Sequence, residues 1–402
     1  MELNVSCVNH AALVNSYYLR ILFLRVSSFR LPLKALSKSS AAAVRRQRKT
    51  VARRRAEQLK ELIAQGKFVP LSFKVRTALR NAYDRFSGER FESENFLPSY
   101  QDGCCGTDAL QDVLNTLREF PRAENLNDGN VHRNLMNCLQ VAEVNGNKYI
   151  LPAGSVFARR DVRAIHEVAL GKHKLIVIDP PWHNKSVSRG NQYVTFDHTD
   201  LLRINVPHIA DLDECILAVW VTNRPRYKAY LQEKVLPSWG FTFHAYWYWL
   251  KLSKSGELLS PLDSTHRLPV ETLVVAYRSR NEEIGQRLRQ QLGEQMRIVL
   301  SVPLRHSWKP PMNCFFDESI GSQIELFARE LRPYWTSVGY EVLKFQDVDL
   351  FQSATSVRRA CTSMRLPALL LFQRFGFYCS RKERREFDTL VSAKNMNEIN
   401  TI

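Results

Sequence analysis

The sequence predicts an α/β fold with a mostly parallel sheet, preceded by a mainly helical N-terminal module. Three observations predict this fold class. Beyond residue 158, short segments rich in Val, Ile and Leu alternate with helical segments. These strand candidates are apolar along their whole length, which is typical of strands covered by helices on both faces. Before residue 140, apolar residues recur instead at helical spacing.

Residues 1–60 are expected to form a basic, disordered tail. They hold thirteen Lys or Arg residues and two acids, and so carry about eleven of the 17 net positive charges of the 402-residue chain. An excess of this kind favours polyanionic partners such as nucleic acid. The run VRRQRKTVARRR at residues 44–55 fits a nuclear-import or nucleic-acid-binding segment, an Arg-rich transit peptide, or a solvated helical face. We expect a nuclear protein, with a mitochondrial location or an additional cytoplasmic pool as alternatives.

Residues 61–150 are predicted to form a mainly helical accessory domain. The segment RRRAEQLKELIAQGK has apolar residues at helical spacing and stops at Gly66. A second helix, in GTDALQDVLNTLREFPR, has Thr107 or Asp108 as its capping residue and ends before Pro121. The following VNGNKYI reads as a hairpin turn that enters a strand.

Residues 151–348 are predicted to form the α/β domain, and residues 349–402 a tail without a recognisable motif. The strand candidates are Lys174–Ile178, Cys215–Val221, Phe241–Leu250, Thr272–Tyr277, Arg297–Val302, Glu325–Ala328 and Tyr340–Phe345. Helical segments between them include Arg226–Val235 and Ser319–Gln323.

The cysteines and the apolar segments predict neither a metal site nor a membrane span. The eight cysteines include no CxxC pair, so we expect reduced thiols in an intracellular protein. The apolar segment at residues 19–36 is interrupted by four basic residues and is too polar to cross a bilayer.

The segment LIVIDPPW, residues 175–182, ends a buried strand with an unusual combination of groups. Ligands of parallel sheets bind beyond the carboxyl ends of the strands, where Asp179 is expected. Its carboxylate accepts hydrogen bonds, and Pro180 offers a fixed carbonyl without a competing N–H. Pro181 stiffens the turn, and Trp182 offers a flat face on which a base can stack. The alternative is a proline-stiffened turn whose Asp caps a neighbour and whose Trp fills the core.

A carboxylate, a fixed carbonyl and an aromatic plane suit the exocyclic amine of adenine. That amine is a poor nucleophile, because its lone pair is delocalised into the ring. Two acceptors on its two protons favour the tetrahedral nitrogen that methyl transfer from S-adenosylmethionine requires. The residues therefore predict N6 methylation of adenine, without a covalent enzyme intermediate.

An ordered set of motifs carries a family resemblance over residues 150–348. DPPWHNKS, WVTNR, PSW, SVP, KPP, ELFAR and WTS…EVLKFQ resemble the adenine N6-methyltransferases built around Asp-Pro-Pro-Trp. This is the family of the catalytic subunit of the messenger-RNA N6-adenosine methyltransferase, and the chain most resembles its methyltransferase-like protein 4 branch. The resemblance implies a Rossmann-like methyltransferase fold that uses S-adenosylmethionine.

The resemblance favours RNA as the substrate, specifically small nuclear RNA at a 2′-O-methyladenosine, with adenine in DNA as the alternative. An inactive nucleic-acid-binding subunit that supports another methyltransferase is an alternative of another class, and methylation of a protein amide is a weaker one. The sequence identifies no protein partner, and a monomer is the default expectation.

The resemblance also assigns roles to individual residues. The catalytic set is Asp179, Pro180, Pro181 and Trp182. The cofactor set is Asp161, Val162, Asp179, Lys309, Glu325, Leu326, Phe327, Arg329 and Glu341. The substrate set is Asn184, Lys185, Tyr193, Trp220, Thr222, Asn223, Arg224 and His306. In these sets, Asp161 and the Val162 backbone hold the cofactor's adenine, Lys309 lies near its carboxylate and Arg329 reaches the ribose. Residues 184–194 form a loop that closes over the site.

Several of these residues have plainer interpretations, and two positions depart from the family pattern. Trp220 could belong to the core, Lys309 to the surface, and Glu325 with Arg329 to an exposed ion pair of little energy. Trp308 stands where the family has His, and Tyr340 where it has Asn near the ribose. These departures put the ribose contacts in doubt and motivate the inactive-subunit alternative. The Gly-rich loop of many methyltransferases is absent from ELFARELRPYW, as in the family.

Overall fold

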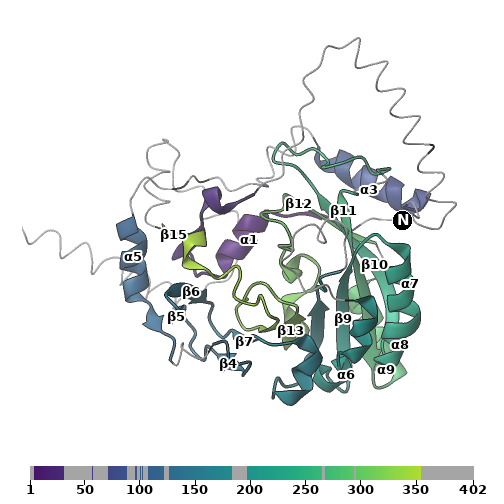
Figure 1. Cartoon of the computed structure of the whole chain (residues 1–402). Helices are drawn as coiled ribbons and strands as arrows, with labels where there is room; N and C mark the ends of the chain where they lie inside the picture. Colours follow the sequence, from purple (N-terminus) through teal and green to yellow (C-terminus); the bar gives the residue numbers. More distant parts are fainter. Residues whose placement is uncertain are drawn as a thin grey trace, which may run out of the picture. The chain divides into compact units, whose positions relative to one another are not determined.

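A long mixed sheet dominates the part of the chain that the computed structural model describes (Figure 1). The described residues are 4–30, 57, 71–87, 96, 100, 102, 107–121, 126–182, 197–264, 268–293 and 296–354. Residues 1–358 form one compact unit, and the described elements lie in it. None of the helices in these ranges is long and apolar enough to cross a membrane.

Within the described ranges, the main sheet has ten strands. In spatial order they are β1 (Asn4–Cys7), β12 (Arg297–Ser301), β10 (Thr242–Lys251), β11 (Val270–Ser279), β9 (Glu214–Val221), β8 (Leu175–Ile178), β13 (Gln323–Leu326), β14 (Thr336–Val338), β7 (Val156–Ala158) and β4 (His132–Arg133). The smaller sheets pair β2 (Leu22–Leu24) with β15 (Phe351–Ser353), and β5 (Gln140–Val144) with β3 (Arg118–Glu119) and β6 (Asn147–Leu151). The α-helices are α1 (His10–Ser16), α3 (Phe73–Phe86), α5 (Thr107–Thr116), α6 (Val206–Ile209), α7 (Pro225–Tyr230), α8 (Leu236–Ser238) and α9 (Glu282–Leu292).

Strand direction decides which segments meet at one edge of the sheet. Neighbours in the run β9-β8-β13-β14-β7 pair in parallel, so their carboxyl ends lie at a common edge. Strand β11 runs antiparallel to β9, so its amino end lies there too. Strands β10 and β12 run parallel to each other and opposite to β11, which brings their carboxyl ends to the same edge. This edge is where ligands of α/β sheets bind.

Strand β8 shows why both faces of the sheet are covered. Ile176 and Ile178 pack in one apolar cluster with α6, α7 and α8. Leu175 and Val177 pack on the opposite face, in a cluster that includes residues of α9. Side chains alternate between the faces of a strand, so a strand buried on both faces needs a continuous apolar sequence. The predicted Rossmann-like α/β fold with a mostly parallel sheet is therefore confirmed.

Most predicted elements of this domain are present, and one strand is wrong. Strands β8 to β12 overlap the predicted segments, and the helix predicted at Arg226–Val235 appears as α7 followed by a π-helical turn, Leu231–Val235. The segment Ser319–Gln323 holds only a 3₁₀ turn, Glu318–Ile320, before β13.

The predicted strand Tyr340–Phe345 is a series of turns, and the strand of this region is β14 instead. Strand β14 ends before Gly339, where a Cβ would lie 3.0 Å from the backbone nitrogen of Ala328. The chain reverses after this close contact. Val342 and Phe345 are apolar because they fill two core clusters under the turns.

The expected disordered tail is wrong for residues 4–30, which belong to the fold. Strand β1 extends the sheet beside β12, and β2 pairs with β15. His10 of α1 is fully buried, edge-on to the rings of Trp249 and Trp308. The C-terminal tail is predicted to start at residue 349, but β15 shows that residues 351–353 also belong to the fold. The basic run at residues 44–55 and residues 355–402 lie outside the described residues.

The described parts of residues 61–150 contain strands as well as helices, and they pack on the sheet instead of forming a separate domain. The predicted helix is present as α5, which begins at Thr107 within the described residues and ends at Thr116, where β3 follows closely. The β5–β6 hairpin is confirmed, with Asn145 and Gly146 at φ 51° and 77° in its turn. Helix α3 packs against strands β10 and β12. The helix predicted to end at Gly66 lies outside the described residues, apart from Glu57.

Candidate active site

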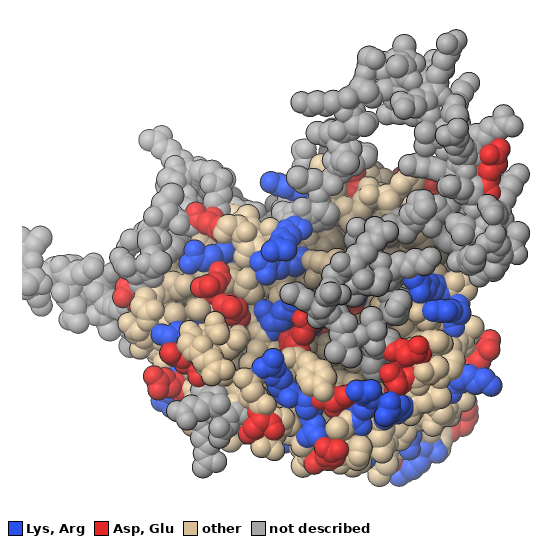
Figure 2. Space-filling model, in the orientation of Figure 1, with Lys and Arg blue, Asp and Glu red and all other residues tan. Residues whose placement is uncertain are grey.

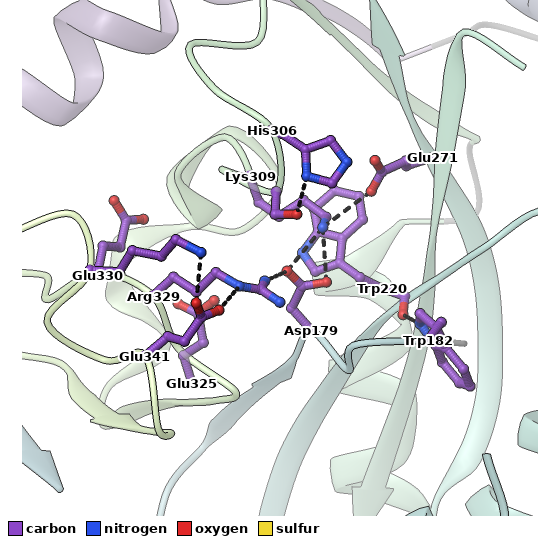
Figure 3. A network of polar contacts seen from close by, with 12 residues as sticks. Asp179, Trp182, Trp220, Glu271, His306, Lys309, Glu325, Arg329, Glu330 and Glu341 are labelled. Carbon is purple, nitrogen blue, oxygen red and sulfur yellow. Dashed lines mark hydrogen bonds and ion pairs between the residues drawn. The ribbon is translucent and has the colours of Figure 1, made fainter. Parts of the chain in front are cut away.

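Ionised side chains from widely separated parts of the sequence gather at the common strand edge (Figure 3). Asp179 follows β8, Arg329 follows β13, and Lys309 comes from the loop after β12. Asp179 and Lys309 are only 5% and 9% exposed. In Figure 3 the Asp179 carboxylate points toward Lys309 and Arg329. The sheet topology thus brings together three of the predicted site residues.

The Asp179 carboxylate is held by two cations. Lys309 Nζ lies 2.8 Å from Oδ1 and 2.9 Å from Oδ2, and Arg329 Nη1 donates to Oδ2 over 2.7 Å. A buried carboxylate requires such partners, because desolvation of an unpaired charge costs several kcal/mol. Burial lowers the pKa of Lys309, but Asp179 and Glu271 outweigh it and raise that pKa above the usual value. The plainer interpretation of Lys309 as a surface residue is therefore wrong.

Glu271, at the amino end of β11, is a site residue that the sequence analysis missed. Its Oε2 lies 3.2 Å from Lys309 Nζ, and Lys251 at the end of β10 pairs with its other oxygen. Burial would raise the pKa of Glu271, yet the two lysines hold it below its usual value. A signal was present, because Glu271 is the only charged residue in the apolar run LPVETLVVAY.

Arg329 continues the ion pairs on the other side of Asp179. Its Nε donates to Glu341 Oε2 over 3.1 Å, and Lys344 Nζ lies 2.7 Å from Glu341 Oε1. Cations and carboxylates thus alternate from Lys251 to Lys344, with Asp179 in the middle. Glu341 follows β14, as the predicted cofactor role requires.

Trp308, one of the two departures from the family pattern, belongs to a second buried network. The Trp308 indole stacks on Phe345 with ring centroids 4.0 Å apart, and its Nε1 donates to Glu330 Oε2 over 2.7 Å. Arg332 joins Glu330 to Glu325, with nitrogen–oxygen distances of 2.8 and 3.0 Å. Trp308 is thus a core residue with a satisfied N–H.

Glu325 and Arg329 are both largely buried and pair with other residues. The proposed exposed ion pair between them is wrong. A small cavity touches both networks. It is lined by Asp179, Ser307, Trp308, Lys309, Glu325, Arg329, Glu330, Arg332 and Phe345.

The turn after β7 carries the residues predicted to hold an adenine. The Asp161 side chain accepts from the backbone N–H of Arg163 and caps the 3₁₀ helix Val162–Glu167. Hydrogen bonds from Arg163 lower the pKa of Asp161, and the Tyr340 hydroxyl contributes to the same effect. The Val162 side chain is buried, so only its backbone can face a ligand. Tyr340, the second departure, therefore lies beside Asp161, on a surface where it is 64% exposed.

Trp182 is fixed by its neighbours. Its indole Nε1 donates to the Trp220 carbonyl over 2.7 Å, and one face stacks on Tyr227 with centroids 4.9 Å apart. Its backbone N–H donates to the Pro180 carbonyl over 2.8 Å, leaving that oxygen a second lone pair. In Figure 3 the indole points away from the Asp179 ion pairs. Trp182 thus partly fills the core, as the plainer interpretation of the turn predicts.

The remaining predicted residues divide into three groups. The Trp220 ring is 1% exposed and packs on Trp249 and Phe315, which agrees with its plainer interpretation as a core residue. Leu326 is likewise a core side chain, which leaves only its backbone at the cofactor edge.

Four of the predicted residues follow strand ends at the site edge: Thr222, Asn223, Arg224 and the partly buried Phe327. His306 is exposed beside Ser307. Asn223 is held by the carbonyl of Val270. Pro181, half-buried, continues the turn after Asp179, and Asn184, Lys185 and Tyr193 lie outside the described residues.

Glu325 makes the stability of the protein depend on pH. Burial and the neighbouring carboxylates of Glu330 and Asp179 raise its pKa to about 7, although Arg332 opposes them. The pKa of this carboxyl is higher in the folded protein than in the unfolded chain. Its contribution to the stability of the fold is therefore complete below the unfolded pKa and is lost as pH rises through the folded pKa. In the unchanged protein this effect lowers the free energy of unfolding by up to about 3 kcal/mol between pH 4.5 and 7. We expect Glu325→Gln to lack this decrease. Urea unfolding at several pH values in this range tests the prediction. The same change of unfolding free energy with pH in both proteins would contradict it.

The chain is similar to one family model and to several curated proteins. Residues 173–341 match the MT-A70 family. The mouse N(6)-adenine-specific methyltransferase METTL4 is 40% identical over 215 residues, which cover 51% of this chain and 45% of the mouse protein. The N6-methyladenosine RNA methyltransferase MTA1 of Pyricularia oryzae is 32% identical, covering 43% of this chain and 48% of its own. A DNA N6-methyl methyltransferase of Caenorhabditis elegans is 31% identical, and the match covers 51% of this chain and 56% of that protein. The chain spans about half the length of these relatives.

Proposed function

We propose, from the MT-A70 domain that the chain carries at residues 173–341, that it methylates the N6 amine of adenine in nucleic acid. The observation that carries the proposal is the position of Asp179. It stands at the carboxyl end of a central parallel strand, directly before Pro180-Pro181-Trp182, among cations from two other strand ends. This combination suits an amine acceptor site and has no evident use in a structural turn.

The residues fit S-adenosylmethionine as the cofactor. Its amino-acid head carries one ammonium and one carboxylate. Lys309 and Arg329 offer cations that match this carboxylate. Asp161 offers a carboxylate for an adenine amine at the neighbouring strand end, and Glu341 an acceptor for hydroxyls. When bound, the cofactor supplies a methyl group on a sulfonium.

The chain's own part is to hold the substrate amine. The Asp179 carboxylate and the free lone pair of the Pro180 carbonyl accept its two hydrogens, which directs the nitrogen lone pair away from the ring. Pro181 and the fixed Trp182 keep these acceptors in place, so little reorganisation is needed during the reaction. The amine proton is lost toward the acceptor that holds it. Asp179 can take this role only where its ion pairs leave a lone pair free.

Within nucleic acid we propose RNA as the polymer, and small nuclear RNA at a 2′-O-methyladenosine as its class. The motif set that resembles the methyltransferase-like protein 4 branch supports this choice, as does the relative named for RNA. Adenine in DNA is the alternative, supported by the relative named for DNA. In both cases the base has to be single-stranded or extruded to reach Asp179. We also propose a nuclear location from the basic run at residues 44–55, which imaging of the tagged chain tests.

The inactive-subunit alternative has lost part of its support. It was motivated by Trp308 and Tyr340, and Trp308 proves to be a core residue with its own hydrogen-bond partner. The Asp-Pro-Pro-Trp segment is intact, and its Asp179 is held by the predicted lysine and arginine.

A methyl-transfer panel tests the proposed function. Purified protein is incubated with labelled S-adenosylmethionine and matched single-stranded RNA and DNA oligonucleotides, with and without a 2′-O-methyl on the adenosine. We expect transfer to RNA, strongest on the 2′-O-methylated adenosine. Transfer to DNA alone would replace RNA by the alternative polymer. Cofactor or RNA binding without any transfer would favour the inactive subunit.

A further inference from the structure

Two arginines flank one buried tyrosine at the site edge of the sheet. Strand β9 ends at Val221 and α7 begins at Pro225, so Arg224 and Arg226 lie just beyond the strand end. Their guanidinium carbons lie 5.7 and 4.8 Å from the ring centroid of Tyr227. Both also donate to the Tyr227 hydroxyl, over 3.3 and 3.0 Å. The tyrosine therefore holds two positive charges close together.

The same tyrosine connects these arginines to the Asp-Pro-Pro-Trp segment. Its ring stacks on Trp182, with an interplanar angle of 22°. His198 packs on Tyr227 as well, with ring centroids 5.1 Å apart. Trp182 is three residues from Asp179, so the arginine pair lies within a short series of contacts from the proposed amine acceptor. One ring thus links the arginine pair to the Asp-Pro-Pro-Trp segment.

Electrostatics distinguish this pair from other surface arginines. Figure 2 shows basic and acidic side chains intermixed on the visible surface, without one extended basic face. Arg280 and Arg287, for example, pair with Asp213 and Glu214. Among the described residues, no carboxylate forms an ion pair with Arg224 or Arg226.

Asp197 is the acid that faces this surface. It accepts from Thr199 and lies 3.0 Å from His198, and Arg226 is one of the groups that lower its pKa.

We propose that Arg224 and Arg226, held on Tyr227, bind the phosphodiester backbone next to the target adenosine. This inference rests on the proposed function, and it adds the surface that orients the strand. A guanidinium that rests on a ring keeps its plane fixed, so fewer rotamers are lost when its outward N–H groups meet a phosphate. The fork geometry of arginine matches two phosphate oxygens. Because the ring also touches Trp182, strand binding and the Asp179 turn share one rigid support.

Salt-dependent binding of an oligonucleotide tests the site. A fluorescent single-stranded RNA that contains one adenosine is titrated with the full-length chain at several salt concentrations, without cofactor. We expect Arg226→Gln to weaken binding about 3- to 10-fold and to reduce the slope of log affinity against log salt by about 0.7. Arg226→Lys keeps the charge but not the planar contact. Its affinity for RNA should therefore lie between those of the unchanged protein and Arg226→Gln. Arg226 is exposed, so these changes should not unfold the protein.

Arg280→Gln is the matched control. It removes the same charge from an arginine that is 66% exposed, beside the amino end of β9, at the opposite edge of the sheet. We expect its affinity and salt slope to equal those of the unchanged protein. Equal losses for Arg226→Gln and Arg280→Gln, or no binding by the unchanged protein, would overturn the site.

Parallel measurements separate this inference from the proposed function. Cofactor binding should be the same in Arg226→Gln and in the unchanged protein, while the KM for RNA rises and kcat changes little. If no variant transfers methyl groups but the binding losses occur as expected, the proposed function fails and the phosphate site stands. If transfer occurs and Arg226→Gln matches Arg280→Gln in KM, the phosphate site fails and the function stands.

Discussion

Asp179→Asn is expected to lower the rate of methyl transfer by about 10²- to 10³-fold or more. Removal of one preorganised hydrogen-bonding group of an active site commonly costs this much. The amide keeps the shape of the side chain but replaces an acceptor by a donor. Its NH₂ group would then face Lys309, Arg329 or the substrate amine, all of which are donors. The measurement is kcat for labelled methyl transfer to the best oligonucleotide of the panel.

Asp213→Asn is the control for this variant. Asp213 is an exposed aspartate at the opposite edge of the sheet, where it pairs with Arg280. Both substitutions remove one negative charge, so only a specific role of Asp179 should separate them. Circular dichroism and thermal unfolding should show that both variants are folded. Transfer by Asp179→Asn at more than a tenth of the unchanged rate would contradict the assigned role.

The sheet and the central motif could be predicted because their signals are local. Strand β8 is apolar throughout and stops at Asp179, so periodicity and composition identify both its burial and its end. The ligand edge follows from parallel strand direction, which explains why Asp179 could be placed there from the sequence. The ordered motifs then added Lys309, which comes from a loop after another strand.

The other parts of the site could not be predicted, because their partners are distant in the sequence. Glu271 acquires its role only when antiparallel pairing brings the start of β11 beside Lys309. His10 lies in a segment whose basic residues resemble a tail, although its helix packs behind Trp308. Tyr340–Phe345 has the apolar content of a strand but forms turns, after Gly339 packs closely on Ala328. In each case tertiary contacts outweigh the local pattern.

Arg332→Met is the second change with a large expected effect, and it acts on stability. Arg332 is fully buried and is shared by Glu325 and Glu330. Methionine fills much of the same volume but leaves two buried carboxylates without a cation. Removal of one partner from a buried ion pair costs about 3–5 kcal/mol. Urea unfolding at pH 8 should show a loss of this size, with the slope against urea unchanged if the native structure is retained.

The pH dependence of Arg332→Met shows whether its loss of stability comes from the missing charge or from poorer packing. Without the arginine, the pKa of Glu325 rises further in the folded state, because Arg332 no longer offsets the effect of burial. A raised folded pKa means that stability is present at low pH and is lost as pH rises. Arg332→Met should therefore recover part of its deficit at pH 5. A deficit that is the same at pH 5 and pH 8 would assign the loss to packing.

Neutralising the two acids provides the decisive comparison. Adding Glu325→Gln and Glu330→Gln to Arg332→Met removes the buried charges together, and a charge network removed as a whole is often close to neutral for stability. We expect the triple variant to regain most of the loss at pH 8, while the Trp308 N–H keeps an acceptor in the amide oxygen that Glu330→Gln introduces. If the triple variant is no more stable than Arg332→Met, the network does not act through charge. Its recovery would show that Arg332 stabilises the fold by balancing the two buried carboxylates.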